Sequence, residues 1–374
     1  MEINKVGFYA PVFRQSPSEE NIRKIMDCCP GIRVEGDGQK GVWGRVIQAS
    51  ETWSADPETR HRASSGGVVS ALAAHMLDSG RVDAIMHVGL QEGSPILNRL
   101  QLSNSREEVL SRVGSRYAPA LIFDRFREWM DQDERSYVFI GKPCDIACLK
   151  NIFKVYPEYC KRFKLLIAFF CAGIPSYLAT EELVARSGVS EEPSHIKYRG
   201  DGWPGCFEVR YTNHEAFRMS YHESWGEVLG RKLGLRCKIC PDGIGLLADV
   251  AVGDSWNTKD GFPDFEESDG KSFVLVRTQR GADIFADALA KGAIISQELA
   301  VDRISEMQNY QYHRRLVAGY RIFPIQMITL FMLKFKGLGL MSSMRKAKVL
   351  DGCNNFDGTL RRLLLNWWRS RGDA

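Results

Sequence analysis

The sequence has no long apolar run and no strong surplus of either charge. Its longest apolar stretch, Ile325 to Phe335, is about half the ~20 residues that a helix needs to cross a bilayer. The 50 basic and 46 acidic residues nearly cancel, and no basic run is interleaved with aromatic residues. These absences argue against a membrane-spanning protein and give no reason to expect a nucleic-acid partner.

A secretory signal, internal repeats and low-complexity segments are also missing. The chain begins MEINKVGFYAPVF, with an acid at position 2 and no apolar core of signal length. We therefore expect a cytoplasmic protein, in which the ten cysteines are buried thiols or metal ligands rather than disulfides. At 374 residues the chain is expected to form two packed domains or one large α/β domain.

The sequence from about residue 60 to 180 alternates between helix-like and strand-like segments. Short apolar runs at 82–90, 137–140 and 165–171 are typical of strands that are buried on both faces. Further strands are predicted at 206–211, 249–256 and 272–278, and a helix is predicted from 281 to 305. The pattern predicts an α/β fold with α+β elements in its C-terminal half. Helices flank a sheet core, followed by a cysteine-bearing loop region and a helical C-terminal tail.

Cys237 and Cys240 form a CxxC motif on a loop that contains Gly and Pro. Such a turn places two thiolates beside one metal, and Arg236 and Lys238 would lower the thiol pKa and offset negative charge. A zinc ribbon would need a second CxxC about 15 to 20 residues away, and the sequence has none. Further ligands must therefore come from distant cysteines; the alternative is two reduced thiols on a loop.

Two further cysteines follow predicted strands. Cys144 comes directly after the strand at 137–140, and Cys171 ends the strand at 165–171. Because the carboxyl ends of parallel strands line one crevice, both thiols are predicted to face the same place. With the CxxC pair they make four thiolates, the number that a 4Fe-4S cluster needs. Either one alone could instead be a buried core cysteine.

The other six cysteines are weaker candidates. Cys148, four residues after Cys144, is interpreted as a core residue one helical turn further on. Cys28 and Cys29 precede Pro30, as at the end of a ferredoxin-type run, but the earlier cysteines of such a run are missing. We interpret this pair as non-ligating.

Three loops combine small residues with hydroxyl, basic or aromatic ones. The first, ASSGG at 63–67, opens a helix, so a phosphate could approach free helix N–H groups; an ordinary capped helix packed on a sheet is the alternative. The loops GSRYAP (114–119) and KYRGDGWPG (197–205) suit binding of a flavin or its pyrophosphate, or are structural turns. No HExxH or Ser/His/Asp pattern occurs, and no catalytic residue is predicted.

Taken together, these motifs resemble the deazaflavin (coenzyme F420) hydrogenase/dehydrogenase beta-subunit family. Six segments carry the resemblance in the same order: SSGGVVSALAAHMLDSGRVDAI, GSRYAP, FIGKPCDIACLK, FFCAGIPS, YRGDGWPG and CKICPDGIGLLADVAVGDSW. The resemblance covers roughly residues 5–280. The family includes 7-hydroxymethyl chlorophyll a reductase and bacterial members that are encoded with polysaccharide genes.

The resemblance implies a non-covalent FAD beside a 4Fe-4S cluster. Electrons would pass between a ferredoxin-like or deazaflavin donor and an organic substrate, with coenzyme F420 as one candidate substrate. The implied cluster ligands are Cys144, Cys171, Cys237 and Cys240. The implied flavin-site residues are Ser64, Ser65, Gly66, Gly67, Arg116, Tyr117, Lys142 and Arg199.

The same resemblance divides the chain into four parts. They are a ferredoxin-like remnant (1–60), a flavin-binding α/β domain (61–185), a domain with the CxxC loop (186–310) and a basic helical tail (311–374). Many members begin with complete ferredoxin-type cysteine runs, so either one cluster suffices here or the start is truncated. We interpret the tail as helices docked on the core, with a membrane-surface role as the alternative.

Two other functions stay open from the sequence. One is a non-catalytic electron-transfer subunit of a larger redox complex, and the other is a zinc-stabilised binding protein. The basic tail suits docking of a partner protein, and a homo-oligomer is the other expected assembly.

Overall fold

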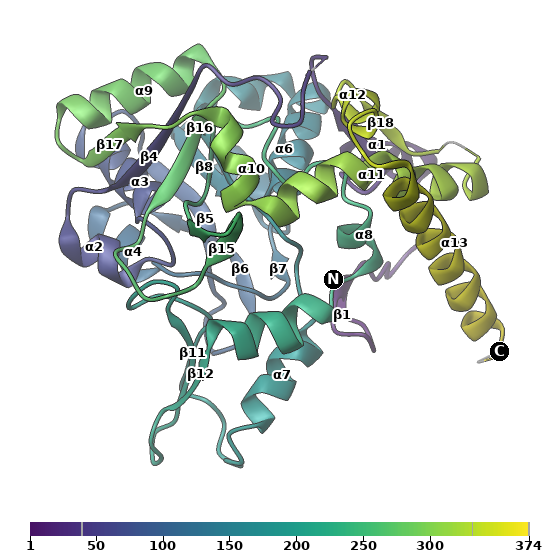
Figure 1. The fold of residues 1–374 in the computed structure, drawn as a ribbon, viewed down its shortest axis with the longest axis horizontal. Helices are drawn as coiled ribbons and strands as arrows, with labels where there is room; N and C mark the ends of the chain where they lie inside the picture. The colour runs from purple at the N-terminus through teal and green to yellow at the C-terminus, as the bar shows by residue number, and fades with distance from the viewer. Residues whose placement is uncertain (39, 331, 373–374) are drawn as a thin grey trace.

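The structure, a computed structural model, describes residues 1–38, 40–330 and 332–372, with only the backbone considered for 366–372. Within this part the centre is a nine-stranded mixed sheet in the order β17-β4-β16-β13-β9-β8-β5-β6-β7 (Figure 1). Its strands are β4 (Gln48–Ser54), β5 (Ala84–Leu90), β6 (Asn98–Ser103), β7 (Ala120–Leu121), β8 (Tyr137–Gly141), β9 (Phe163–Phe169), β13 (Val250–Asp254), β16 (Ser272–Val276) and β17 (Ile294–Glu298).

Helices cover both faces of this sheet because its strands are apolar on both sides. On β8, Val138 and Ile140 belong to one core, whereas Tyr137 and Phe139 belong to the other. The first core includes α3 (Val68–Asp78) and α9 (Gln279–Ala290). The second includes α5 (Phe126–Gln132), α6 (Pro143–Val155), α10 (Ile304–Met307) and α11 (Asn309–Ile328). This arrangement confirms the predicted α/β class.

A separate antiparallel sheet lies below the large one in Figure 1. It consists of β10 (His195–Lys197), β11 (Cys206–Arg210) and β12 (Phe217–Ser220), and it shares a third core with α7 (Tyr177–Ala185) and η2 (His222–Val228). The sheet brings the loop between β10 and β11, which contains Arg199, toward the large sheet.

The remaining elements are short, apart from the first and last helices. They are β1 (Glu2–Ile3), β2 (Tyr9–Ala10), α1 (Glu19–Cys28), β3 (Arg33–Glu35), α2 (Pro57–Arg62), α4 (Arg106–Ser111), η1 (Pro157–Arg162), η3 (Leu229–Arg231), α8 (Leu235–Lys238), β14 (Asn257–Lys259), β15 (Phe262–Asp264), η4 (Val301–Arg303), β18 (Lys334–Lys336), α12 (Leu340–Met344) and α13 (Val349–Gly372). Among the described residues, no helix has the length and apolar character of a membrane span.

The predicted helix at 281–305 is wrong in its second half. Helix α9 ends at Ala290, and residues 294–298 form β17, which pairs antiparallel with β4. The large sheet takes strands from residues 61–185 and from residues 186–310 alike. The predicted boundary at residue 185 therefore falls between strands of one sheet, and the division into domains stays a prediction.

The chain segments that were singled out from the sequence meet at the carboxyl ends of the parallel strands, which we call the carboxyl edge of the sheet. Strands β8, β9 and β13 run parallel, so their carboxyl ends, at Gly141, Phe169 and Asp254, lie at the same edge. Strand β16 runs the other way, and its first residue, Ser272, pairs with Asp254 at this edge. The loops that follow these ends form the site described next.

Candidate functional site

Cys144 lies in the first turn of α6, directly after β8. The turn is fixed by Asp145, whose carboxylate accepts hydrogen bonds from the Lys142 backbone N–H (2.9 Å) and from Lys142 Nζ (2.7 Å). Burial and the carboxylate of Asp145 raise the pKa of the Cys144 thiol well above its usual value. Although burial opposes its charge, Asp145 and the Cys144 thiol raise the pKa of Lys142. A cation therefore stands beside the first predicted ligand.

The segment that carries Cys171 is hydrogen-bonded to the CxxC loop. The Cys171 N–H donates to the Gly243 carbonyl oxygen (2.9 Å), and the Ile174 N–H donates to Cys237 Sγ (3.4 Å). In the CxxC loop, Cys240 Sγ donates to the Asp242 carbonyl oxygen (3.2 Å). Cys237 lies in α8 and Cys240 just after it, so the loop following β9 and the CxxC turn form one unit.

The thiols lie close enough to affect one another's pKa in pairs: Cys171 is near Cys237 and Cys240, and Cys144 is near Cys171 and Cys240. Burial, together with the nearby thiols of Cys237 and Cys240, raises the pKa of Cys171 to about 12. Besides burial and Asp145, the thiols of Cys171 and Cys240 act on the pKa of Cys144 in the same direction. The structure thus brings together the four cysteines that the sequence singled out.

The four cysteines come from three segments of the chain that meet after the carboxyl ends of β8 and β9. Within the described part of the chain, no three His, Cys, Asp or Glu side chains are grouped closely enough to hold a single metal ion. In a 4Fe-4S cluster each cysteine binds a different iron, so the sulfurs enclose the cluster and do not converge on one ion. Four cysteines are the number that such a cluster needs, and the assignment of these four as its ligands stays a prediction.

Arg314, on α11, joins the two cysteine-bearing segments, and sequence reasoning missed it. Its Nη1 donates to the carbonyl oxygens of Cys171 (3.3 Å) and Ala172 (2.6 Å), and its Nη2 donates to that of Cys237 (2.6 Å). The side chain is buried, and its positive charge lies near the thiols of Cys171 and Cys240. Arg314 stands in a helical stretch with no motif, so no local signal marks it.

The serine–glycine loop at 64–67 lies against the other two predicted loops. Ser64 Oγ accepts from the Ser115 N–H (2.6 Å) and donates to the Arg199 carbonyl oxygen (3.3 Å). Ser65 Oγ lies 2.9 Å from Ser272 Oγ, at the start of β16. Residues 64–65, 115 and 199, which are far apart in the sequence, therefore meet at the carboxyl edge of the sheet.

The two glycines of this loop are required by packing. A Cβ on Gly66 would lie 2.7 Å from the Thr52 carbonyl oxygen, and Gly67 has a left-handed φ of 75°. These constraints account for both glycines without a ligand. No side chain caps α3, however, so its first amides are available to an anionic group.

Arg199 is held in an aromatic enclosure. It is 2% exposed, its Nη1 donates to Asp254 Oδ2 (2.7 Å), and its guanidinium lies 4.9 Å from the ring centres of Tyr221 and Trp256. Trp203 stacks on Trp256 at 4.7 Å, with the rings 6° from parallel. Among the residues that the structure describes, two buried donors here, Arg199 Nη2 and Trp203 Nε1, have no hydrogen-bond partner. Sequence reasoning missed Tyr221, which stands outside every motif.

Of the remaining predicted flavin residues, two lie near the loop that carries Arg199 and one lies near the cysteines. Arg116 donates to the Ile196 carbonyl oxygen (3.4 Å), and burial lowers its pKa. Tyr117 contacts the rings of Tyr198 and Trp225, so both residues lie with the loop that carries Arg199. Lys142 instead lies with the thiols of Cys144 and Cys171.

The cysteines and the Arg199 enclosure are connected through β9, β13 and α11. The Phe170 N–H, next to Cys171, donates to the Val252 carbonyl oxygen (2.8 Å) on β13, the strand that ends at Asp254. Gln308, just before α11, donates to the Asp254 carbonyl oxygen (2.7 Å), and Arg314 on the same helix holds Cys171. The segment from Gln308 to Arg314 therefore contacts both the cysteine-bearing loops and the strand end at Asp254 beside Arg199.

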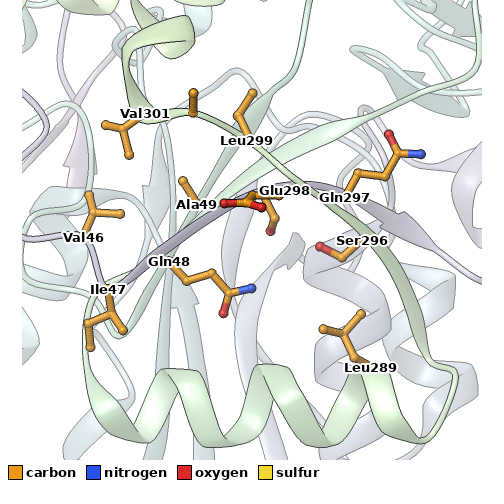
Figure 2. Close-up of a pocket in the computed structure, with 12 residues that line it drawn as sticks. Val46, Ile47, Gln48, Ala49, Leu289, Ser296, Gln297, Glu298, Leu299 and Val301 are labelled. Carbon is orange, nitrogen blue, oxygen red and sulfur yellow. The ribbon is translucent and has the colours of Figure 1, made fainter.

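A large cavity lies elsewhere on the sheet. Its volume is about 630 Å³, and Gln48, Ser50, Ser296, Glu298 and Leu289 are among its lining residues (Figure 2). Gln48 pairs with Val276, the last residue of β16, whereas the cysteine-bearing loops lie near its first residue, Ser272. This cavity therefore extends toward the end of the sheet opposite those loops. None of its lining residues was predicted to be functional, and it shares none with the cysteine group.

Two sequence profiles of one family, "Coenzyme F420 hydrogenase/dehydrogenase, beta subunit", match the chain. The profile of the family's N-terminal part matches residues 49–125, and the profile of its C-terminal part matches residues 134–301. The matched ranges contain every predicted cluster and flavin residue. The chain belongs to the coenzyme F420 hydrogenase/dehydrogenase beta-subunit family, which confirms the family predicted from the motifs.

Individual relatives are distant but cover much of the chain. An uncharacterized protein of Methanocaldococcus jannaschii is 25% identical over 293 residues, which are 75% of this chain and 75% of the relative. The F420-dependent formate dehydrogenase 1 subunit beta of Methanococcus maripaludis is 25% identical over 250 residues, 64% of this chain and 59% of that protein.

A solved structure shares the fold. A chain of the F420-reducing [NiFe] hydrogenase complex from Methanosarcina barkeri, studied with xenon, superposes with a TM-score of 0.57 and 19% identity. The match covers 76% of this chain and 96% of that one. At this identity the likeness shows the fold alone, and it agrees with the mixed sheet and its helical layers.

Proposed function

We propose that the chain is a flavin and iron–sulfur oxidoreductase that moves electrons between a deazaflavin or ferredoxin-like donor and an organic substrate. Membership of the family supports an oxidoreductase role. The names of its relatives, a formate dehydrogenase beta subunit and a hydrogenase complex, describe proteins that use coenzyme F420. The single observation that carries the proposal is the grouping of four cysteine thiols at the carboxyl edge of the sheet.

In this proposal Cys144, Cys171, Cys237 and Cys240 hold one 4Fe-4S cluster. The donor set fits, because the four thiols come from three segments that lie near one another, beside the cations of Lys142 and Arg314. Positive charge at this distance stabilises an anionic cluster and its reduced form. Hydrogen bonds from Arg314 keep the two ligand-bearing segments at a fixed separation.

The proposed flavin site lies where the three loops meet. The unpartnered donors of Arg199 and Trp203 and the uncapped start of α3 fit the acceptor atoms and phosphates of an FAD. A bound flavin takes up two electrons together and can release them one at a time to a cluster nearby. The chain's own part is to orient the flavin with Arg199 and Tyr117 and to exclude water with the aromatic enclosure.

The first experiment is a visible spectrum of the anaerobically purified chain, with iron, sulfide, zinc and extracted flavin measured on the same sample. We expect FAD and about four irons per chain. A colourless protein that carries one zinc after cluster and flavin reconstitution would overturn the proposal in favour of the zinc-stabilised binding protein.

A second candidate is a non-catalytic electron-transfer subunit within a larger complex. The observation that favours it is that the solved structure with the same fold belongs to a multi-subunit hydrogenase complex. Reduction of the isolated chain by reduced deazaflavin, followed spectroscopically with and without an artificial acceptor, distinguishes the two. Reduction without turnover in the presence of any organic acceptor tested would favour the electron-transfer subunit.

A further inference from the structure

The last residues of α11 and the connection that follows them to β18 expose several apolar side chains. Met327, Ile328 and Met332 are each more than half exposed, and Leu330 is 84% exposed. Exposed apolar side chains in soluble proteins are normally scattered singly, whereas these stand within six positions of the chain. We call residues 327–330 together with Met332 the apolar loop.

The apolar loop is not an extension of a badly packed helix. Helix α11 buries Leu316, Val317, Ile322 and Ile325 against the core, and α13 packs along it through a ring contact of Phe356 with Phe323. Beyond the loop, β18 pairs with β3 in parallel register, Lys334 opposite Arg33. Both ends of the loop are therefore held, by the packed helix α11 on one side and by the pairing of β18 with β3 on the other.

The charged side chains of the segment that contains this loop are of one sign. From residue 307 to residue 350 the sequence contains no Asp or Glu and eight Lys and Arg. Lys334, Arg345, Lys346 and Lys348 are exposed, and none forms an ion pair with a residue in the described part of the chain. Lys336 is the exception, because it lies near Glu35.

A second group of exposed apolar side chains continues the pattern. Met341, Val349 and Leu350 are each about two thirds exposed or more, and they flank Arg345, Lys346 and Lys348 along the chain. In Figure 1, β18, α12, the end of α11 and the start of α13 gather on one side of the molecule, away from α9 and β17.

We propose that the apolar loop and the basic residues that follow it dock the protein on an anionic lipid surface. Apolar side chains that enter the headgroup region, combined with unpaired lysines that attract anionic lipids, are the two components of interfacial membrane binding. A lipid surface accounts for both features at once, because it offers apolar chains behind a negatively charged layer. This inference does not depend on the proposed redox function.

The test is flotation of the purified full-length holoprotein with vesicles of phosphatidylcholine alone or mixed with phosphatidylglycerol. We expect binding to the anionic vesicles only, and a loss of binding as the salt concentration rises. The double variant Ile328→Ser, Leu330→Ser and the double variant Lys334→Glu, Lys346→Glu should each lower the apparent affinity on the order of tenfold or more.

Matched controls come from the other side of the molecule. Ile295 is exposed on β17 and Lys291 follows α9, so Ile295→Ser and Lys291→Glu remove the same chemistry elsewhere and should leave vesicle binding unchanged. Thermal unfolding of every variant checks that the fold is intact. Because the vesicle assay needs no redox activity, its result is separate from that of the spectral test above.

Three outcomes would overturn the inference. They are no vesicle binding by the unaltered protein, equal binding to neutral vesicles, and unchanged binding by the folded loop variant. A dimer seen by light scattering that is lost in the loop variant, without vesicle binding, would assign this surface to a second copy of the chain instead.

Discussion

Helix α6 carries one cysteine of each of two cysteine groups, Cys144 and Cys148, one helical turn apart. The side chains around the two groups differ in charge. Cys144 belongs to the group with Cys171, Cys237 and Cys240, where Lys142 and Arg314 bring positive charge. Cys148 lies near Cys28 and Cys29, where burial and the carboxylate of Asp145 raise its pKa. We call these the strand-edge group and the α1 group.

The difference teaches that the number of thiols does not identify a cluster site. Burial and the carboxylate of Asp27 raise the pKa of Cys28, and only Arg33 opposes them. The two groups are even joined, because Arg236 in the CxxC loop donates to the Pro30 carbonyl oxygen beside the α1 group. Burial raises the pKa of thiols in both groups, so what distinguishes the strand-edge group is the positive charge of Lys142 and Arg314, which would offset the charge of an anionic cluster.

The largest expected effect tests this comparison directly. Cys240→Ser should lower the iron content from about four atoms per chain to nearly none and abolish the broad visible absorbance, because it removes a ligand. Cys29→Ser and Cys148→Ser should keep both signals. Iron analysis and spectra of anaerobic protein measure this, and retention of the cluster in Cys240→Ser together with loss in Cys148→Ser would reverse the two roles.

The next effect separates a positioning role from a structural one. Arg314→Gln should lower the free energy of unfolding by about 4 kcal/mol, because three carbonyl oxygens lose a charged donor, and should also shorten the lifetime of the cluster in air. Urea unfolding and the decay of visible absorbance measure the two effects.

Arg162 offers the matched control for Arg314. It is similarly buried and donates to the carbonyl oxygens of Arg135 and Met130 near the amino ends of β8 and β9, opposite the ends that lead to the cysteines. Arg162→Gln should cost similar stability and leave cluster decay unchanged. If both variants lose the cluster at the same rate, Arg314 acts only through the stability of the fold.

Mild acid should act on the protein through neither cysteine group. Burial, and then the charge of Arg112, lower the pKa of His87 to about 4 from its usual 6.5, so the unfolded chain binds a proton first. Stability is fully present above pH 6.5 and decreases as the pH falls toward 4, by about 3 kcal/mol in total. Urea unfolding across this range should show the slope, and His87→Gln should flatten it.

The smallest effect sharpens the interpretation of the α1 group. Cys148→Ala should lower the free energy of unfolding by about 1 kcal/mol, because it removes a partly buried sulfur from the contact between α6 and α1. Cys160→Ala, at an exposed thiol, should change it by less than about 0.5 kcal/mol. A gain of metal or a loss of flavin in Cys148→Ala would show that the α1 group does more than pack.

The strand-edge group was predictable because its signals are local. Cys144 and Cys171 each follow a short apolar run, and parallel neighbouring strands bring such positions to one edge. Arg314 was not predictable, since it stands 143 residues from Cys171 along the chain and no pattern announces a contact of that range. The assignment of ligands and flavin residues itself stays a prediction.

The strands that are apolar were predicted correctly, whereas β17 and β4, the two strands at one side of the sheet, were missed. Strands β8, β9, β13 and β16 have continuous apolar sequences and match the expected positions. Strand β4 reads QASETWS and β17 reads IISQE, and both are too polar to stand out. Their conformation depends on pairing with each other and with β16, which is tertiary information.

The stacked indoles of Trp203 and Trp256 form a pair whose circular dichroism can report on the aromatic enclosure. Two indole rings 4.7 Å apart couple their electronic transitions, and where the two transition dipoles are twisted relative to each other this coupling gives paired bands of opposite sign in circular dichroism. Because Arg199 lies over one of these rings, we expect a molecule that binds beside it to change the signal of the pair. Occupancy of the aromatic enclosure can therefore be followed by light in the unlabelled protein.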